Sequence, residues 1–385
     1  MKSPAPTSTR SGHYISQPSG YRAFVPVPLP PKPAVALGGE LLRLLSDADR
    51  ALGRLDGSVQ TLPNPDLFVF MYVRKEAVLS SQIEGTQSSL QDVLAAEAQL
   101  FDQVPKDVDE VVNYVRAMNH GLARLSKLPI SVRLIREIHT ELLRDVRGGR
   151  LQLGELRTSQ NWIGPAGSTL ATATFIPPPP HLVAESLGAL EQFLHHTDEM
   201  PPLVKIALAH VQFETIHPFL DGNGRVGRLL VTFLLTERGI LHKPVLYLSH
   251  YFREHRQAYY DHLQAVRDRG EWEAWLAFFL RGIIEVAAQA AETARRILQL
   301  REEHRAAITA KFGRAAGTGH KVLESLFDRP IVSVNDVRKL TGTAYVAANT
   351  SVARLVDIGV LQELTGRVRN RRFRYAPYIA LFTDA

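Results

Sequence analysis

The sequence predicts a mainly α-helical protein that carries a short β-hairpin inside a helical bundle and a winged helix-turn-helix at its C-terminal end. Most of residues 37–312 form amphipathic patterns, in which apolar residues recur at a spacing of three and four. A stretch rich in Gly, Pro, Ser and Thr, from Gly154 to Pro180, interrupts these patterns. Residues 316–385 change again, to three short helices followed by a β-ribbon.

These changes divide the chain, whose 385 residues are too many for one ordinary core. Residues 1–36 are rich in proline and predict an extended, partly disordered arm. Residues 37–107 predict an N-terminal helical region, and residues 108–290 predict a helical core that includes the hairpin. Residues 291–315 predict a linker helix ending in a hinge, and residues 316–385 the winged helix-turn-helix.

Composition excludes several classes of protein. The chain contains no cysteine, which rules out disulfides, thiolate zinc sites and cysteine nucleophiles. No apolar run reaches the roughly 18 residues of a membrane-spanning helix. The first residues, MKSPAPTSTRSGHYISQPSG, lack the apolar segment of a secretory signal. These features predict a cytoplasmic protein that has no membrane partner.

The excess positive charge lies at the C-terminal end. Residues 301–385 hold 14 Lys and Arg against 8 Asp and Glu, which accounts for the formal net charge of +6. Five arginines line the predicted ribbon: Arg367, Arg369, Arg371, Arg372 and Arg374. Because alternate side chains of a strand point to the same face, the first three arginines would share one face, and that face could bind DNA phosphates. Winged helices also dock proteins or dimerise, so the tail predicts DNA, another protein or a second copy of the chain as its partner.

The most informative segment for function is the loop that joins the predicted helices VKIALAHVQFETI and RVGRLLVTFLLTER. The loop contains Gly222, Asn223 and Gly224. A glycine-rich loop that enters a helix directs free backbone N–H groups and the positive end of the helix dipole at one point, which favours an anion. Arg225 and Arg228 are three residues apart, so both can reach the same anion.

Two further residues of this loop suggest the chemistry. Asp221 offers a hard oxygen ligand for Mg²⁺, the usual companion of nucleotide phosphates, and His217 can accept a proton near neutral pH. Phosphoryl or nucleotidyl transfer is therefore predicted. A P-loop would need a lysine after the glycines, and an EF-hand would need an acid where Thr232 stands. The alternative is a turn whose polar residues only shape the backbone.

Residues 217–228, HPFLDGNGRVGR, resemble the signature HPFx[DE]GNGRxxR of the Fic/Doc family without a departure. The resemblance implies a Fic-fold helical bundle that acts as a protein adenylyltransferase, moving AMP from ATP to Ser, Thr or Tyr hydroxyls of proteins, its own included. It implies His217 as the base and Asp221 as the Mg²⁺ ligand. The residues implied to bind the nucleotide phosphates are Gly222, Asn223, Gly224, Arg225 and Arg228, with Arg228 at the γ end.

A second segment resembles a regulatory motif of the same family. Ser80 and Glu84 share one helical face and Gly85 follows, which on its own indicates a capped helix end with a solvated glutamate. SSQIEG is, however, similar to the inhibitory motif [ST]xxxE[GN], and it precedes the core. The resemblance implies that Glu84 contacts Arg228, the arginine needed by the γ-phosphate of ATP, and that basal activity is low.

The resemblance also implies where the target and the base bind. Thr174, Phe175 and Ile176 would form the edge strand, or flap, on which target segments dock by β-augmentation; a surface loop with a buried Phe175 is the alternative. Tyr260 would lie near the nucleobase, although Tyr259 and Tyr260 could equally be packing aromatics. Arg267 stands where some members have asparagine, which leaves the choice of nucleotide open.

Two rival functions fit the same residues. The first is a different reaction at the same site: transfer of another phosphate-linked group, or removal of AMP with Glu84 positioning a water. The second is a DNA-binding transcriptional regulator in which the Fic core senses a nucleotide.

Overall fold

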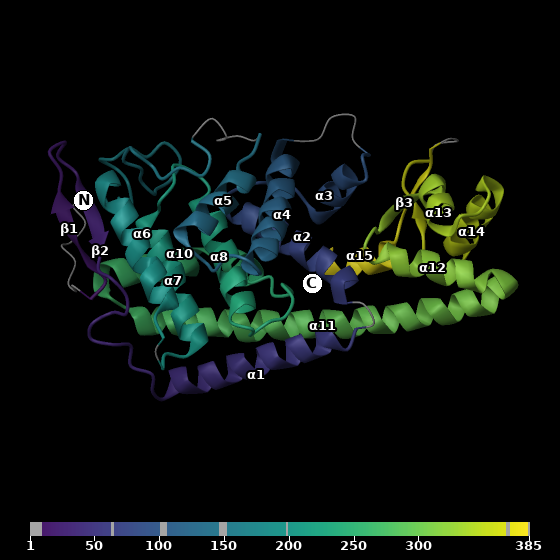
Figure 1. Ribbon diagram of the computed structural model, residues 1–385, viewed down its shortest axis with the longest axis horizontal. Coiled ribbons are helices and arrows are strands. Elements are labelled where there is room, and N and C mark those ends of the chain that lie inside the picture. Colours follow the sequence, from purple (N-terminus) through teal and green to yellow (C-terminus); the bar gives the residue numbers. More distant parts are fainter. Residues whose placement is uncertain are drawn as a thin grey trace.

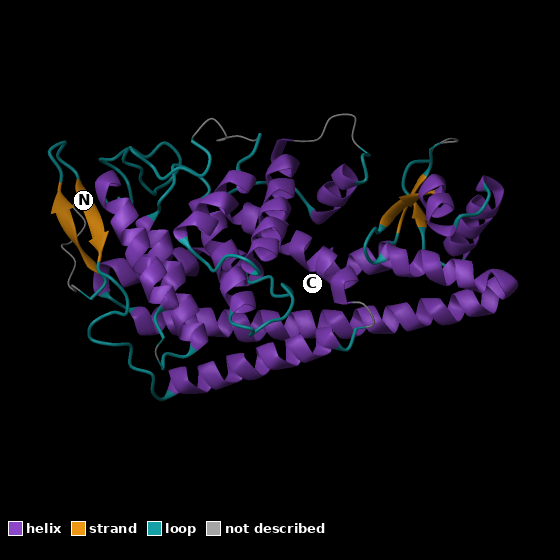
Figure 2. Cartoon of the chain, viewed as in Figure 1, coloured by secondary structure: helices purple, strands orange, loops and turns teal. Residues whose placement is uncertain are grey.

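A computed structural model describes residues 10–62, 65–100, 106–145, 152–197, 199–366 and 370–383. Most of them are helical, as predicted (Figure 2). The helices before the C-terminal module are α1 (Glu40–Gln60), α2 (Pro65–Ile83), α3 (Leu90–Glu97), α4 (Lys106–Leu125), α5 (Val132–Leu142), α6 (Pro180–His195), α7 (Pro202–Ile216), α8 (Asn223–Glu237), α9 (Ser249–Glu254), α10 (Arg256–Arg269) and α11 (Trp272–Phe312).

Helix α11 runs along the long axis of the molecule, with α1 beside it and the core helices on its other side (Figure 1). Its buried face begins with Trp272 and Trp275 and continues through small residues such as Ala287 and Ala294. Small side chains let neighbouring helices approach closely. Because α11 runs unbroken from Trp272 to Phe312, residues 291–312 of the predicted linker helix are the second half of α11.

One stretch of the described residues, Trp272–Leu326, is long and apolar enough to cross a membrane by length and composition. Most of its most apolar window, 61%, is buried inside the protein. Burial of this kind is typical of a central core helix, so the stretch is weak evidence for a membrane span.

The N-terminal arm contains a β-hairpin that was not predicted. Strands β1 (Gly12–Ser16) and β2 (Arg22–Pro26) pair antiparallel, with Tyr14 opposite Phe24. Phe24 is fully buried, and Arg10 forms a two-point ion pair with Glu273 on α11. High proline content therefore misled the prediction for residues 10–36, where buried aromatics and ion pairs hold the chain against the core. Residues 1–9 lie outside the described part.

The C-terminal module follows a turn rather than a flexible hinge. Gly313, at φ 54°, begins the short 3-10 turn η1 (Gly313–Ala315). The elements after it are α12 (Ala316–Leu326), β3 (Ile331–Ser333), α13 (Val334–Thr341), α14 (Tyr345–Asp357), β4 (Gln362–Glu363), β5 (Arg372–Arg374) and α15 (Ala376–Thr383). The strands form one antiparallel sheet in the order β3-β5-β4. Helix α15, which was not predicted, packs Phe382 against Tyr72 of α2.

The described arginines of the predicted ribbon make contacts inside the module. Arg371 donates to Asn349, Arg372 to Asp336 and Arg374 to Gln362. Arg367 and Arg369 lie outside the described residues, so the predicted alternating face is not seen. DNA binding by the module stays a prediction.

Candidate active site

The predicted loop lies between two helices at the centre of the core. Every residue of α7 from Leu203 to Ile216 is buried, and so is almost all of α8. Between them, His217 adopts a left-handed conformation at φ 49° and ends α7 by donating its backbone N–H to Phe213, while Gly222 at φ 77° begins α8. A positive φ is uncommon for a non-glycine residue and is often found at functional sites.

Asn223 holds the loop in shape. Its side-chain oxygen accepts from the Phe219 N–H and its side-chain amide donates to the Phe219 carbonyl, both at 2.8 Å. The side chain was predicted to bind phosphate, but in this structure both of its polar atoms are used by the loop. The first-turn N–H groups of α8 have no partner within the helix and still face the anion position.

Two polar residues outside the motif, Arg157 and Asn161, hydrogen-bond the backbone of the same loop, and sequence reasoning did not find their roles. Arg157 donates its backbone N–H to the Pro218 carbonyl and its Nε to the His217 carbonyl, both at 2.9 Å. Asn161 donates to the Phe219 carbonyl at 2.8 Å. These contacts are to backbone atoms, so no spacing in the sequence signals them.

His139 of α5 supports the loop at Asp221. Its Nδ1 accepts the Gly154 N–H at 3.0 Å, so its Nε2 carries the proton and donates to the Asp221 carbonyl at 3.1 Å. Its ring stacks on Phe219 with centroids 3.8 Å apart. Burial lowers the pKa of His139 to about 4, which keeps the ring neutral and able to make both bonds.

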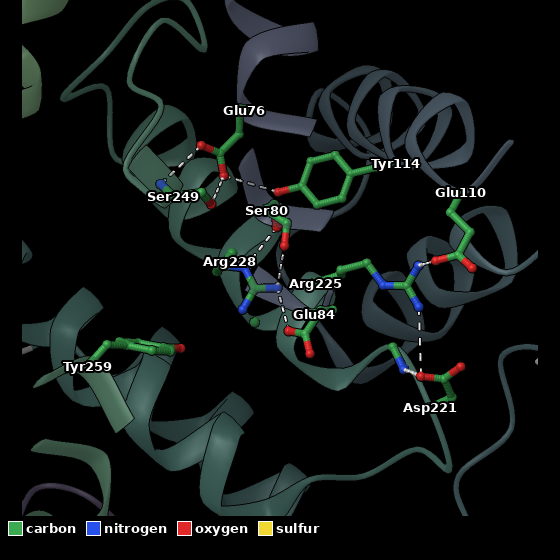
Figure 3. Close-up of polar contacts among 12 residues, drawn as sticks. Glu76, Ser80, Glu84, Glu110, Tyr114, Asp221, Arg225, Arg228, Ser249 and Tyr259 are labelled. Atoms are coloured by element: carbon green, nitrogen blue, oxygen red, sulfur yellow. Dashed lines mark hydrogen bonds and ion pairs between the residues drawn. The ribbon is translucent and has the colours of Figure 1, made fainter. Parts of the chain in front are cut away.

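The predicted inhibitory contact is present in the structure (Figure 3). Glu84, just beyond the end of α2, accepts a hydrogen bond of 2.6 Å from a terminal nitrogen of Arg228. The hydroxyl of Ser80 accepts from Arg228 Nε at 2.8 Å, and the Ser80 carbonyl accepts a further bond at 3.1 Å. Ser80 and Glu84 therefore occupy Arg228 from two sides. Gly85, at φ 104°, turns the chain away after the helix.

Each charge of this pair stabilises the other. Burial raises the pKa of Glu84, but the charge and hydrogen bond of Arg228 outweigh burial, so the pKa lies below its ordinary value. Burial likewise lowers the pKa of Arg228, and the Glu84 carboxylate more than reverses this. Arg228 is almost fully buried, whereas 39% of the Glu84 side chain is exposed. The pair is ionised at neutral pH.

Arg225 and Asp221 lie beside this pair. Arg225 donates to Glu110 of α4 at 3.0 Å and is 3.7 Å from the Asp221 carboxylate (Figure 3). Asp221 also accepts from the Gly222 N–H at 2.6 Å, and 46% of its side chain is exposed. No cluster of three or more metal-ligating side chains occurs among the described residues. One partly exposed carboxylate nonetheless fits Mg²⁺, which usually takes one or two carboxylates together with phosphate oxygens and waters.

A cavity of about 850 Å³ lies beside the Glu84–Arg228 pair. Its walls come from the loop, the end of α2, the flap segment and α10; they include Glu84, Trp162, Thr174, Phe175, Glu214, His217, Gly224, Arg228, Tyr260 and Arg267. The volume lies in the range of small-molecule sites. The predicted site residues that line this cavity are Glu84, Thr174, Phe175, His217, Gly224, Arg228 and Tyr260. Four other residues of the predicted loop do not line it: Asp221, Gly222, Asn223 and Arg225.

Two residues that line this cavity carry a side-chain atom that is buried without an ordinary hydrogen bond among the described residues: Nδ1 of His217 and Oε1 of Glu214. Burial, followed by the charges of Arg267 and Arg157, lowers the pKa of His217 to about 3. The imidazole is therefore neutral at pH 7, the form that can accept a proton. Burial raises the pKa of Glu214 to about 7.

The flap segment and the tyrosine pair each show features of both alternatives that the sequence left open. Ile163 and Phe175 form a single antiparallel bridge, with hydrogen bonds of 2.8 and 3.0 Å. Phe175 is buried and Thr174 is exposed, so the segment is a hairpin with a packed underside. Both tyrosines line the cavity. Tyr259 is a buried packing residue that hydrogen-bonds His210 at 2.9 Å, whereas Tyr260 is only half-buried.

Gly227→Ala is expected to lower the melting temperature of the protein. A Cβ at Gly227 would lie 2.2 Å from Oε1 of buried Glu214 and 3.2 Å from the Phe213 ring. Overpacking of this kind costs roughly 1–3 kcal/mol. Gly188→Ala, inside α6 with open space around it, is the matched control and should be neutral or slightly stabilising. Thermal unfolding of both variants tests this; equal melting temperatures would contradict the close contact.

Comparison with known proteins gives a consistent result. Residues 42–123 match the model of the Fic/DOC family N-terminal region, and residues 129–235 match that of the Fic/DOC family. The chain is 30% identical over 186 residues to proteins named Protein adenylyltransferase Fic from Drosophila ananassae and Drosophila melanogaster. The match covers 48% of this chain and 33% and 34% of those proteins, so the chain spans about a third of the length of these curated relatives.

Solved structures show the same fold. A Fic family protein from Desulfovibrio desulfuricans G20 aligns with a TM-score of 0.57 and 18% identity, covering 89% of this chain and 97% of that one. A Fic domain containing signaling protein from Bacteroides thetaiotaomicron aligns with a TM-score of 0.51 and 18% identity, covering 65% and 97%. These likenesses confirm the predicted helical fold.

Proposed function

Because this chain belongs to the Fic/DOC family, we propose that it is a protein adenylyltransferase, which transfers AMP from ATP to Ser, Thr or Tyr hydroxyls of a protein, its own included. The observation that carries the proposal is that a neutral His217 and Arg228 line one cavity large enough for a nucleotide, with Asp221 in the loop between them. The curated relatives that match half of the chain are named for this activity.

The loop residues divide the proposed reaction between them. His217 takes the proton of the target hydroxyl while the hydroxyl oxygen forms a bond to the α-phosphorus of ATP. The bond from this phosphorus to the bridging oxygen breaks, and pyrophosphate leaves. Arg228 and the first-turn N–H groups of α8 stabilise the negative charge that develops. Mg²⁺, when held by Asp221 and the phosphates, would neutralise part of the same charge.

We further propose that the protein is autoinhibited by Glu84. Two of the three nitrogens of Arg228 are occupied by Ser80 and Glu84, so a terminal phosphate oxygen must compete with the Glu84 carboxylate for this arginine. The carboxylate also repels phosphate where it lines the cavity. Productive binding of ATP therefore requires the end of α2 to move or Glu84 to be removed.

Inhibition is expected to be insensitive to pH between about 5 and 8. Arg228 outweighs burial and keeps the pKa of Glu84 below its ordinary 4.5. A lowered pKa means that the contact is fully present above the ordinary value and is lost only as pH falls through the lowered one. The ratio of the AMP-transfer rate of Glu84→Gly to that of wild type should stay constant over this range. A wild-type rate that climbs toward that of Glu84→Gly as the pH drops from 8 to 5 would contradict this.

Labelled ATP tests the proposed reaction. Glu84→Gly protein is incubated with Mg²⁺ and ATP labelled at either the α- or the γ-phosphate, alone and with a lysate of possible targets. Transfer of AMP places only the α-label on protein. Label from the γ-phosphate would indicate kinase chemistry. If ATP binds and neither label is transferred, the proposal fails, and protein that already carries AMP is then the substrate to test, since removal of AMP could use the same groups.

A further inference from the structure

Arg267 of α10 lies at the junction of three parts of the molecule. Its side chain is 4% exposed and lines the cavity. Its Nε donates to the Thr215 hydroxyl at 3.2 Å and a terminal nitrogen donates to the Glu214 carbonyl at 3.1 Å. Both acceptors lie in the last turn of α7, immediately before His217. Arg267 therefore fixes the backbone that carries the proposed base.

The same guanidinium supports the flap. It lies 3.9 Å from the centre of the Phe175 ring, a cation–π distance, and Phe175 is 2% exposed. Burial lowers the pKa of Arg267 to about 10, so the group stays charged at neutral pH. One buried cation thus contacts both the flap and the turn that presents His217.

The N-terminal hairpin also contacts the flap, through Phe24. Phe24 of β2, fully buried, packs against Phe175 with ring centroids 5.8 Å apart, and its N–H donates to the Ile176 carbonyl at 2.9 Å. The proline-rich segment that follows Ile176 has no N–H groups with which to extend this pairing. The hairpin therefore supports the flap through Phe24, and the Phe175 ring that Phe24 contacts is the ring that Arg267 contacts.

We propose that Arg267 is a positioning residue that holds the target-docking flap in a set orientation relative to His217, with Phe24 as the support behind the flap. The proposal rests on the function proposed above. A hydroxyl presented by the flap must meet both the α-phosphorus and His217, and a displacement of about 1 Å can reduce a rate on the order of 100-fold. Arg267 contacts the flap and the last turn of α7, not the start of α8, so its removal should affect the protein substrate more than the binding of ATP phosphates.

The test uses full-length Glu84→Gly protein as the parent and adds Arg267→Gln or Arg267→Lys. Two products are measured: AMP attached to protein and AMP released to water. Arg267→Gln should lower the ratio of attached to released AMP by roughly 10- to 100-fold, with ATP affinity within about twofold of the parent. Arg267→Lys keeps the charge but lacks the planar group that stacks and donates to two acceptors, so it should be nearly as impaired.

The controls separate positioning from a loss of fold. Arg269→Gln, two residues along α10 and paired with Glu271 on the surface, should match the parent. Phe24→Ala should lower the same ratio, whereas Val25→Ala, whose side chain points to the opposite face of β2, should not.

Three outcomes would overturn the inference: an unchanged ratio in Arg267→Gln, full rescue by lysine, or a parallel fall in both products. If the Glu84→Gly parent itself transfers no AMP, the proposed function fails first and the inference falls with it.

Discussion

Glu84→Gly is expected to raise the initial rate of AMP transfer roughly 10- to 100-fold over wild type. The substitution removes a 2.6 Å charged hydrogen bond to Arg228. Bonds to charged groups contribute roughly 1.5–3 kcal/mol, and about 1.4 kcal/mol corresponds to a factor of ten. Because 39% of the Glu84 side chain is exposed, solvent screening places the effect toward the lower end. The α-phosphate label attached to protein, at ATP concentrations below saturation, measures it.

Two further variants test whether the increase comes from loss of the Glu84 charge. Glu84→Gln keeps a hydrogen-bond acceptor without the charge and should give an intermediate rate. Glu97→Gln breaks a different ion pair of the N-terminal region, between Glu97 and Arg74 at 2.7 Å, and should leave the rate at the wild-type level. Equal rates for wild type and Glu84→Gly would show that the contact with Arg228 does not limit activity.

His217→Ala in the Glu84→Gly background is expected to lower AMP transfer by roughly 10²- to 10⁴-fold, the usual contribution of a general base. His217 lines the cavity with a neutral imidazole, and no other histidine lines it among the described residues. Affinity for ATP, measured by calorimetry, should change little, because the proposed phosphate contacts come from the first-turn N–H groups of α8 and from the Arg228 side chain.

A second variant at His217 takes account of its backbone conformation. His217 has a φ of 49°, a conformation that asparagine tolerates better than alanine. His217→Asn should therefore lose activity as fully as His217→Ala while keeping more of the stability. His242→Ala, at an exposed histidine paired with Asp56, is the control and should retain full activity. Substantial transfer by His217→Asn would contradict the role of His217 as the base.

The catalytic loop could be predicted because its chemistry is local. His217, Asp221, Arg225 and Arg228 lie within one short segment, so the loop and the first turns of α8 keep them near one another. Their final contacts are less local, because His217 and Arg228 line the cavity whereas Arg225 bonds Glu110 of α4. Glu84 is different: it lies far away in the sequence, and its meeting with Arg228 depends on how α2 packs. Only the resemblance to a family motif made that contact predictable.

The residues that sequence reasoning missed act through the backbone or through distant packing. Side chains of three residues donate to loop carbonyls: Arg157, Asn161 and His139. Every residue has a backbone carbonyl, so the sequence does not show which one will accept a hydrogen bond. The hairpin was missed for another reason: its proline-rich composition resembles a disordered arm, while the buried Phe24 and the Arg10–Glu273 pair that hold it depend on partners far along the chain.

The most direct test of the central claim is the intact mass of the proteins after incubation with Mg²⁺ and ATP. Glu84→Gly and Glu84→Gly/His217→Ala are compared, each alone and with a lysate of possible targets. We expect a protein that gains the mass of one adenylyl group with Glu84→Gly and no such gain with the double variant. A gain of only a phosphoryl group, or no gain although ATP is bound, would contradict AMP transfer at this site.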